Sequence, residues 1–264
     1  MDADEPPFSD ELASRLAEAE RVAVLTGAGV SAESGVPTFR DESGGLWEKF
    51  SPQELANVEA FLDNPELVQG WYAHRREVVT GTEPNPAHRA LANLEVLVAE
   101  DGGSFLLATQ NVDDLHRQAG SQNVVELHGN ITRSYCIDCG REASEEEMRP
   151  DGNGDGAACP ACGGLLRPDV VWFGERLPEG AMEQAHQAAA ACDVFLSVGT
   201  SAVVYPAAGL PLAAAERGAY TAEVNPERSA VAGELNEVIL EKAGEVLPPL
   251  VEAARERRPS AGNA

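Results

Sequence analysis

The chain has 264 residues and carries 44 acidic residues against 19 lysines and arginines, a formal net charge of −25 at pH 7. This length fits one large domain or one domain with a smaller lobe, and a hydrophobic content of 43% supports a substantial core. The charge argues against nucleic acid as a direct partner, because phosphate binding needs a basic face. No stretch is apolar enough to cross a bilayer, and the acidic start lacks the features of a secretory signal, so we expect a cytoplasmic protein with no membrane partner.

The positive charge is almost entirely arginine, since Lys49 and Lys242 are the two lysines of the chain. An acidic, lysine-poor surface suits a cytoplasm with very high salt, because at ~1 M salt the Debye length is only ~3 Å and like charges stop repelling one another. We therefore expect a halophilic protein of haloarchaeal origin that loses structure at low ionic strength. The alternative is an ordinary acidic protein.

The pattern predicts short apolar strands that alternate with helices. A helix over 9–20 comes first, with Ser9 or Asp10 as its cap. Each strand that follows ends in small or polar residues. Such alternation is typical of an α/β fold with a parallel sheet covered by helices on both faces. The expected strands are 21–29, 104–111, 123–129, 193–201 and 219–226, and the further helices are 87–100, 113–119, 179–191 and 207–217.

The alternation also predicts where a ligand binds, because open parallel sheets take their ligands beyond the carboxyl ends of the strands. The residues collected there are Gly27, Gly29, Gln110, Asn111, Asp113, His128, Gly199, Thr200, Ser201 and Asn225.

Two segments interrupt the alternation and are predicted to form a second, smaller lobe. Residues 41–84 contain an irregular stretch and then a helix from Pro65 to about Val79. Residues 133–167 are rich in cysteine, glycine and aspartate. We therefore assign 41–84 to a helical insertion, 133–167 to a metal-binding module, and 1–40, 85–132 and 168–264 to the large domain.

The cysteines predict one structural zinc ion. Two CxxC pairs are separated by nineteen residues, which is a spacing typical of a four-thiolate site, and Gly140 and Gly163 suit the tight turns. Four thiolates close the coordination sphere, so this zinc would not be catalytic. The fifth cysteine, Cys192, is interpreted as a small core residue. The expected ligands are Cys136, Cys139, Cys159 and Cys162.

A glycine-containing loop, GAGVSAESGVPTFR at 27–40, follows the first strand. Gly27 and Gly29 would let the backbone approach a phosphate, and a helix N-terminus after them would favour the charge. By itself this pattern fits a plain tight turn nearly as well. Two further side chains sharpen it: Arg40 has the charge to hold a pyrophosphate, and Phe39 has the bulk to shield a reactive centre from water.

Seven motifs in one order resemble the sirtuins, the NAD-dependent protein lysine deacylases. The glycine loop is followed by TQNVDDLHRQAG (109–120), ELHGN (126–130), the paired CxxC, PDVVWFGE (168–175), GTS (199–201) and VNPE (224–227). The resemblance spans roughly residues 21–250 and implies a Rossmann-like large domain, a zinc-bearing small lobe, NAD as co-substrate and acylated protein lysines as partners.

The resemblance also implies a cofactor site across the ends of the strands. Gln110 and Asn111 would bind the nicotinamide ribose, and Asp113 would accept a hydrogen bond from the carboxamide. Ala243 would border the adenine, although Glu241 stands where the family has glycine. The full expected set is Gly27, Ala28, Gly29, Ser31, Phe39, Arg40, Gln110, Asn111, Asp113, Gly199, Thr200, Ser201, Asn225 and Ala243.

For catalysis, the resemblance implies His128 as general base, with Asn111 in the catalytic set. The acyl oxygen of lysine would capture C1′ of the ribose, and His128 would deprotonate a ribose hydroxyl, for which its near-neutral pKa is suited. Without the resemblance, a structural turn histidine fits His128 equally well. We interpret His116 as a packing or capping residue and His88 as a local hydrogen-bonding residue.

The segment VVWFG (170–174) is open to two interpretations, a core strand or an edge that pairs with the backbone of a substrate peptide. The family resemblance favours the second, with VVYP (203–206) on the other side of the peptide. It implies substrate contacts from Val171, Trp172 and Phe173.

The helix that begins at Pro65 carries Tyr72 and Arg75 on one face, because they are three residues apart. A surface ion pair of the arginine is the simplest interpretation by composition. Tyr-x-x-Arg at this point, however, resembles the sirtuin subgroup that removes succinyl, malonyl or glutaryl groups, in which the two side chains grip the distal carboxylate. The guanidinium suits this role because it offers two parallel donors.

The leading hypothesis is therefore an NAD-dependent lysine deacylase that prefers acidic acyl groups. A plain deacetylase is the alternative, and mono-ADP-ribosylation is a third possibility. A non-catalytic zinc-ribbon binding module belongs to another class, but it would predict basic or aromatic surroundings rather than an acidic chain with the NAD motifs.

Overall fold

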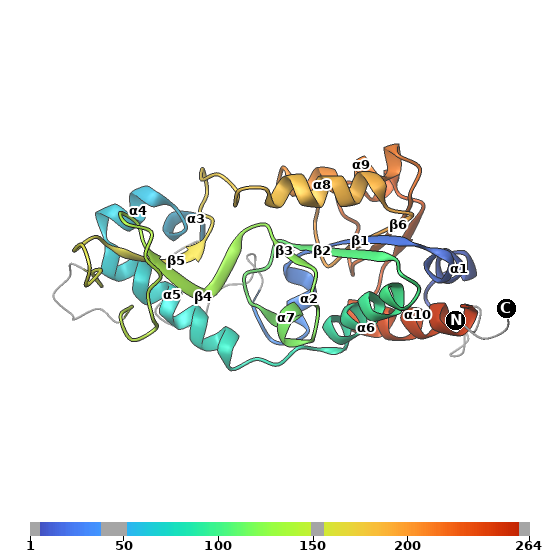
Figure 1. Cartoon of the computed structure of the whole chain (residues 1–264), viewed down its shortest axis with the longest axis horizontal. Coiled ribbons are helices and arrows are strands. Elements are labelled where there is room, and N and C mark those ends of the chain that lie inside the picture. Colours follow the sequence, from blue (N-terminus) through green and yellow to red (C-terminus); the bar gives the residue numbers. More distant parts are fainter. Residues whose placement is uncertain (1–5, 38–51, 149–155, 259–264) are drawn as a thin grey trace.

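The computed structural model describes residues 6–37, 52–148 and 156–258. Two lobes lie along the long axis of the molecule, with a six-stranded sheet at one end and a two-stranded sheet at the other (Figure 1). Of the helices in these three ranges, none is both long and apolar enough to pass through a bilayer.

The large sheet is parallel throughout, in the order β3-β2-β1-β6-β7-β8. The direction of winding reverses between β1 and β6, and open parallel sheets bind their ligands at such a switch point. We call the region formed by the loops after β1, β2 and β6 the crevice. The Rossmann-like sheet is thereby confirmed. One strand, β8, was not predicted, because its three residues are too few to form a pattern. The strands are β1 (Arg21–Thr26), β2 (Ser104–Thr109), β3 (Val124–Glu126), β6 (Val194–Val198), β7 (Tyr220–Val224) and β8 (Glu237–Ile239).

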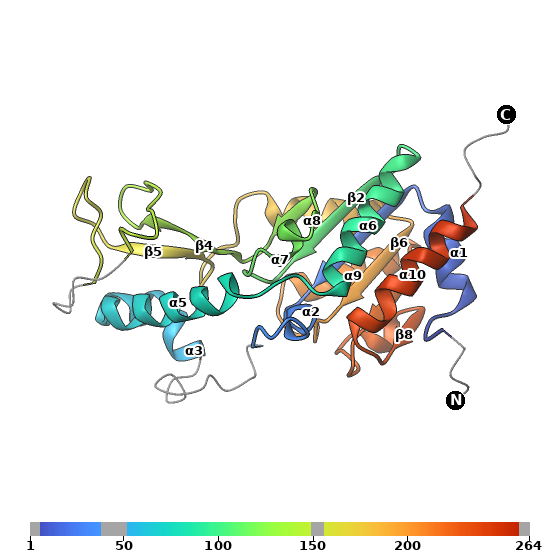
Figure 2. The same cartoon turned by 90° about the horizontal axis from the view of Figure 1, so that it is seen from below.

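Helices cover both faces of this sheet, each over its own apolar cluster (Figures 1 and 2). The first helix is capped by Ser9, whose hydroxyl accepts a hydrogen bond from the Leu12 amide at 3.1 Å. One face carries α1 (Asp10–Glu18), α6 (Pro86–Glu100) and α10 (Ala243–Arg257), and the other carries α8 (Ala181–Ala191), the 3-10 turn Ala207–Gly209 and α9 (Leu210–Glu216). A second 3-10 turn spans Ala232–Glu234.

The predicted helix over 113–119 is shorter than expected. Asp114 has a positive φ of 65°, so the residues before it cannot be helical, and α7 spans Leu115–Gln118 alone. The turn made by Asp114 brings Asp113 back towards the ends of the strands.

Among the described residues, the small lobe contains three helices and an antiparallel strand pair around a separate apolar core. The predicted domain boundaries at 132 and 168 fall inside its two strands, and the division of the chain into domains stays a prediction. The elements are α3 (Pro52–Leu55), α4 (Val58–Asp63), α5 (Pro65–Thr80), β4 (Gly129–Cys136) and β5 (Leu166–Val170).

Helix α5 confirms the predicted helix from Pro65. The Asn64 side chain caps it by accepting from the Leu67 amide at 3.1 Å, and Gly81 follows its last turn. Its buried positions recur every three or four residues, which turns one face to the core. That face includes Val68, Trp71, Tyr72, Arg76 and Val79, and Arg75 lies at its edge.

Candidate active site

Two strand ends meet backbone to backbone at the crevice. Gly27 follows β1 and begins the short helix α2 (Ala28–Ala32), and Gly199 follows β6. The Gly29 amide donates to the Gly199 carbonyl at 2.8 Å. A Cβ on Gly29 would lie 2.8 Å from the Gly199 carbonyl oxygen, and one on Gly27 would lie 2.8 Å from the Thr200 Cβ. The close approach of the two loops therefore requires glycine at both positions. This requirement is additional to the predicted approach of a phosphate.

Asn111 is fixed at the end of β2 by three hydrogen bonds. Its side-chain amide donates to the Gly27 carbonyl and to the Ser31 hydroxyl, both at 3.0 Å. Its backbone amide donates to the Thr109 hydroxyl at 3.0 Å. The structure therefore joins the end of β2 to the glycine loop through this one side chain, close to where the sequence placed it.

Asp113 lies beside the same serine. Its carboxylate accepts from the Leu115 amide at 3.0 Å and from the Ser31 hydroxyl. Burial raises the pKa of Asp113, and these two hydrogen bonds oppose the shift. The result is a buried acceptor whose orientation is fixed by α7.

The tautomer of His128 follows from its partner. Nδ1 of His128 lies 3.1 Å from the Gln110 carbonyl oxygen, and because a carbonyl only accepts, Nδ1 carries the proton. The lone pair is then on Nε2. Burial lowers the pKa of His128, and the Gln110 bond opposes this shift, so the ring is neutral near pH 7. The side chain of Gln110 donates to the Thr200 hydroxyl at 3.0 Å, which connects His128 to the loop after β6.

Two further histidines are buried against residues of β1 and of the glycine loop. The sequence does not predict this arrangement. Asn85 and His88 form a capping box, and the Asn85 amide donates to Nδ1 of His88 at 3.3 Å. Nε2 of His88 therefore carries the proton and faces the Ser31 hydroxyl at 3.4 Å. His116 is hydrogen-bonded through Nε2 to the Thr26 hydroxyl at 2.9 Å.

The rings of His88 and His116 are in contact at a centroid distance of 4.8 Å, with their planes tilted by 56°. Burial lowers the pKa of His88 to about 4 and lowers the pKa of His116 well below its usual range. Both rings are neutral, as a buried pair must be. The expectation of packing for His116 and local bonding for His88 is confirmed, but each also supports a residue of the crevice.

The remaining predicted cofactor residues lie on the loops after β6 and β7 and at the start of α10. The Ser201 carbonyl accepts from the Ala230 amide at 3.1 Å, and the Asn225 amide donates to the Ile239 carbonyl at 3.1 Å. Ala243 is buried in the core on one face of the sheet, and its place beside the adenine stays a prediction. Phe39 and Arg40 lie outside the described residues.

In the small lobe, Tyr72 is buried and its hydroxyl accepts a hydrogen bond from Nε1 of Trp172 at 2.9 Å. Arg75 lies one turn further along α5, with Cζ 4.9 Å from the centre of a ring of Trp71. Burial raises the pKa of Tyr72 to about 12, against the effect of the Arg75 charge, and burial lowers the pKa of Arg75. Tyr72 is therefore a neutral phenol, while an arginine stays charged at physiological pH.

The segment after β5 excludes one of the two interpretations of residues 170–174. The strand ends at Val170, residues 171 and 172 are irregular and a turn follows at 173–174, so the segment is not a core strand. The indole of Trp172 is buried in the small-lobe core, and the contact of this residue with substrate stays a prediction. Phe173, in contrast, is 52% exposed and Val171 is half-buried.

Three successive amide groups of this segment, those of residues 171–173, are used within the protein. The amide of Val171 donates to the His128 carbonyl at 2.9 Å, that of Trp172 to Glu175 at 2.8 Å, and that of Phe173 to the Ala56 carbonyl at 3.0 Å. A substrate strand would therefore have to donate to carbonyl groups here. The first of these bonds also joins the segment directly to His128.

The four predicted ligand cysteines are brought together. Their sulfurs all lie within 4.8 Å of one another, with Cys136 and Cys162 at 3.5 Å and Cys139 and Cys159 at 3.8 Å. A tetrahedral zinc with bonds of ~2.3 Å places its sulfurs ~3.8 Å apart, whereas a disulfide needs ~2.05 Å. The residues therefore fit one structural zinc ion. The turns after the two pairs have the positive φ that Gly140 and Gly163 provide.

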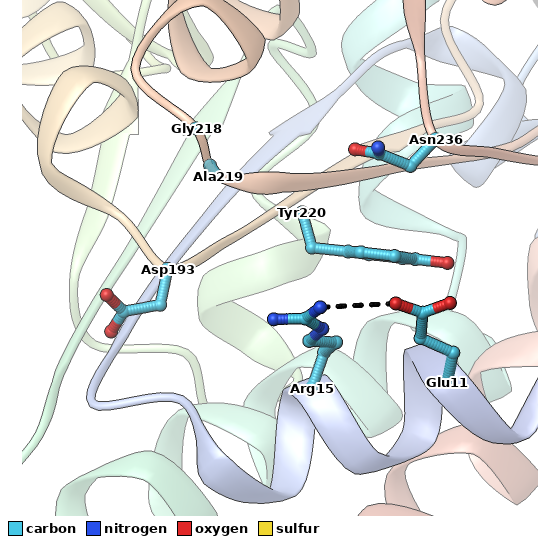
Figure 3. Close-up of a pocket in the computed structure, with 7 residues that line it drawn as sticks. All are labelled: Glu11, Arg15, Asp193, Gly218, Ala219, Tyr220 and Asn236. Carbon is cyan, nitrogen blue, oxygen red and sulfur yellow. Dashed lines mark hydrogen bonds and ion pairs between the residues drawn. The ribbon is translucent and has the colours of Figure 1, made fainter.

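A surface pocket of about 290 Å³ lies at the opposite end of the strands of the large sheet (Figure 3). It is formed at the amino ends of β6 and β7 together with α1, where Arg15 pairs with Glu11 at 3.2 Å and lies over the ring of Tyr220. Because parallel sheets bind their ligands at the carboxyl ends, we do not assign the active site to this pocket.

Comparison with known proteins agrees with this geometry. Residues 27–206 match the model of the Sir2 family. An NAD-dependent protein deacylase of Thermus thermophilus is 55% identical over 218 residues, which cover 83% of this chain and 84% of that protein. NAD-dependent protein deacylase 2 of Pyrobaculum aerophilum is 50% identical over 250 residues, with 93% and 96% covered.

Among solved structures, a Sir2 homolog–NAD complex has a TM-score of 0.83 at 42% identity, with 94% of each chain covered. A complex of Sir2 with a p53 peptide and NAD⁺ has a TM-score of 0.82 at 31% identity, with 94% of this chain and 98% of that chain covered. The chain belongs to the Sir2 family. It is an NAD-dependent protein deacylase, with NAD as co-substrate and a cysteine cluster that suits one structural zinc.

Proposed function

We propose that the protein removes succinyl and malonyl groups in preference to acetyl groups from protein lysines, giving nicotinamide, O-acyl-ADP-ribose and free lysine. The observation that carries the preference is the pairing of a neutral phenol, Tyr72, with a guanidinium, Arg75, on one face of α5. Together they offer an O–H donor and a fork of N–H donors, which matches the two oxygens of a carboxylate.

The position of this pair relative to His128 supports the proposal. The carbonyl of His128 accepts from the Val171 amide, and the next residue, Trp172, holds the Tyr72 hydroxyl. The proposed acyl-binding pair is thus connected to the proposed base through two adjacent residues.

The size of the preference follows from the desolvation of Arg75. Burial disfavours the charged guanidinium, and a bound carboxylate compensates for this cost where a methyl group cannot. A charge-assisted hydrogen bond contributes about 1.5–3 kcal/mol, so one such bond favours succinyl over acetyl by roughly one to two orders of magnitude.

For the chemical step, we propose that Nε2 of His128 takes a proton from a ribose hydroxyl. NAD supplies the ribose carbon that the acyl oxygen of lysine captures. Asn111 and Ser31 hold the glycine loop in place, and Asp113 is a buried acceptor suited to a carboxamide N–H. The Gln110 carbonyl keeps the His128 proton on Nδ1, so the base is ready without a tautomer change.

The substitution Arg75→Met tests the acyl preference, with Arg76→Met as the matched control. Arg76 is structural, because it donates to the Ile131 carbonyl at 2.8 Å and to the Ser134 hydroxyl at 3.0 Å. We expect Arg75→Met to lower kcat/KM for a succinyl-lysine peptide by about 10- to 100-fold and to change that for the acetyl peptide by less than about 3-fold. Arg76→Met should lower both activities together.

If Arg75→Met also lowers both activities together, Arg75 is a structural residue and the proposal fails. A plain deacetylase is then the better function. One observation favours it: the Tyr72 hydroxyl already has a partner in Trp172, as a purely structural tyrosine would.

We further propose that the protein works in a cytoplasm of high salt. The excess of acidic residues, 44 against 19 basic ones, supports this. Repulsion among these charges is screened at ~1 M salt. The melting temperature should therefore rise markedly between about 50 mM and molar potassium chloride. A melting temperature that does not depend on salt contradicts this proposal, and leaves the acyl preference untouched.

A further inference from the structure

Trp172 is held from several sides inside the small lobe. Its backbone amide donates to Glu175 at 2.8 Å, and the guanidinium of Arg167 lies 3.6 Å from the centre of its ring. Phe61 packs at a centroid distance of 5.0 Å. Arg167 is itself buried and makes two bonds to the Glu175 carboxylate, at 2.6 and 2.8 Å. An indole fixed on its backbone and its ring has little freedom to rotate.

The fixed indole decides how the Tyr72 hydroxyl can be used. An indole N–H only donates, so the 2.9 Å bond from Trp172 makes the phenolic oxygen the acceptor. The single hydroxyl hydrogen of Tyr72 cannot point back along this bond. It is directed to another side of the oxygen, and the positive charge of Arg75 is close enough to influence the phenol.

We propose that Trp172, fixed by Arg167 and Glu175, is a positioning residue that directs the Tyr72 hydroxyl hydrogen towards the carboxylate of an acidic acyl group. This inference rests on the proposed preference for such groups. The indole does not touch the substrate; it removes the rotational freedom that a phenol in an apolar pocket would otherwise lose on binding. The arrangement strengthens the binding of acidic acyl groups, whereas an acetyl group has no oxygen at its tip to accept the hydrogen bond.

The substitution Trp172→Phe tests this inference, because it removes the N–H donor and keeps an aromatic ring. The measured quantity is the ratio of kcat/KM for succinyl- and acetyl-lysine peptides of one sequence. Both substrates are assayed on one preparation, so the ratio does not depend on the fraction of folded enzyme. We expect the ratio to fall by about 3- to 10-fold, the effect of one neutral hydrogen bond, mainly through a higher KM for the succinyl peptide.

Two further variants separate positioning from packing. Phe61→Leu loosens the packing around the ring of Trp172 without removing the N–H, and should leave the ratio within about 2-fold of wild type. In a Tyr72→Phe background, Trp172→Phe should not change the ratio further, because the hydroxyl through which it acts is absent.

The outcomes are distinguishable from failure of the proposed function. If wild type prefers succinyl and Tyr72→Phe removes that preference while Trp172→Phe does not, the positioning role is wrong and the proposed function stands. An equal effect of Trp172→Phe in both backgrounds also overturns the inference. A wild-type enzyme without any preference for succinyl contradicts both the proposed function and the positioning role of Trp172.

Discussion

The crevice of the large lobe includes direct contacts to backbone groups, whereas the proposed acyl-binding pair of the small lobe is held by side chains. At the crevice, the Gly29 amide bonds the Gly199 carbonyl directly, and Asn111 and His128 each bond a backbone carbonyl. In the small lobe, Tyr72 is held by the indole of Trp172.

The difference has a physical consequence for specificity. Backbone approaches at strand ends tolerate no added Cβ, so the geometry of the crevice is a property of the sheet. A side-chain pair on a helix can be exchanged without moving the sheet. The account therefore predicts that changes at the crevice affect all acyl groups alike, and that changes at Tyr72 and Arg75 affect them selectively.

The largest expected effect is that of His128→Ala. Removal of a general base typically lowers rate by 10²- to 10⁴-fold, and we expect a fall of about this size for succinyl, malonyl and acetyl peptides alike. Steady-state product release and circular dichroism of the same samples measure the rate and the fold. A loss confined to one acyl group contradicts the division of roles between the lobes.

The next effect concerns the contact between the two loops. Gly29→Ala places a Cβ 2.8 Å from the Gly199 carbonyl oxygen, and overpacking of this kind costs about 1–3 kcal/mol. We expect a melting temperature lower by about 2–10 °C and a higher KM for NAD. The control is Gly209→Ala, whose new Cβ would have no heavy atom within 4 Å. Equal behaviour of the two variants means that the crevice is more adaptable than we infer.

The smallest effect is a dependence of stability on pH from the buried histidine pair. The folded pKa of His88, about 4, lies below its usual 6.5, so the fold favours the neutral ring. This contribution is fully present above pH 6.5 and is lost as the pH falls towards 4. Melting temperatures across this window should fall less steeply for His88→Gln than for wild type.

His186, which is exposed, provides the matched control for this prediction. His186→Gln should keep the wild-type slope. If His88→Gln keeps the wild-type slope too, the prediction is wrong. Protonation of the carboxylates of this acidic chain alone then accounts for the fall in melting temperature at low pH.

The two regions also differ in how far the sequence predicts them. The crevice is encoded in short contiguous motifs at strand ends, so the sequence alone predicts that Asn111, Asp113 and His128 lie at this end of the sheet. The hydrogen bond between Tyr72 and Trp172 joins residues one hundred positions apart, and no local sequence pattern predicts it. For the same reason the sequence does not predict that the ring of Trp172 is buried.

Smaller differences have local causes. The strand β8 has three residues, too few for a pattern, and α7 is shortened by the left-handed conformation of Asp114. The contacts of His88 and His116 beneath the crevice depend on the packing of α6 and α7, which a single sequence does not reveal.

The most direct test is a set of rates for one peptide that carries acetyl, malonyl, succinyl or glutaryl groups on the same lysine, measured with wild-type enzyme and saturating NAD in high salt. The account predicts that kcat/KM for at least one acidic acyl group exceeds that for acetyl by about 10-fold or more. If the acetyl peptide were the best substrate, the account would be contradicted. Tyr72 and Arg75 would then not determine the acyl specificity.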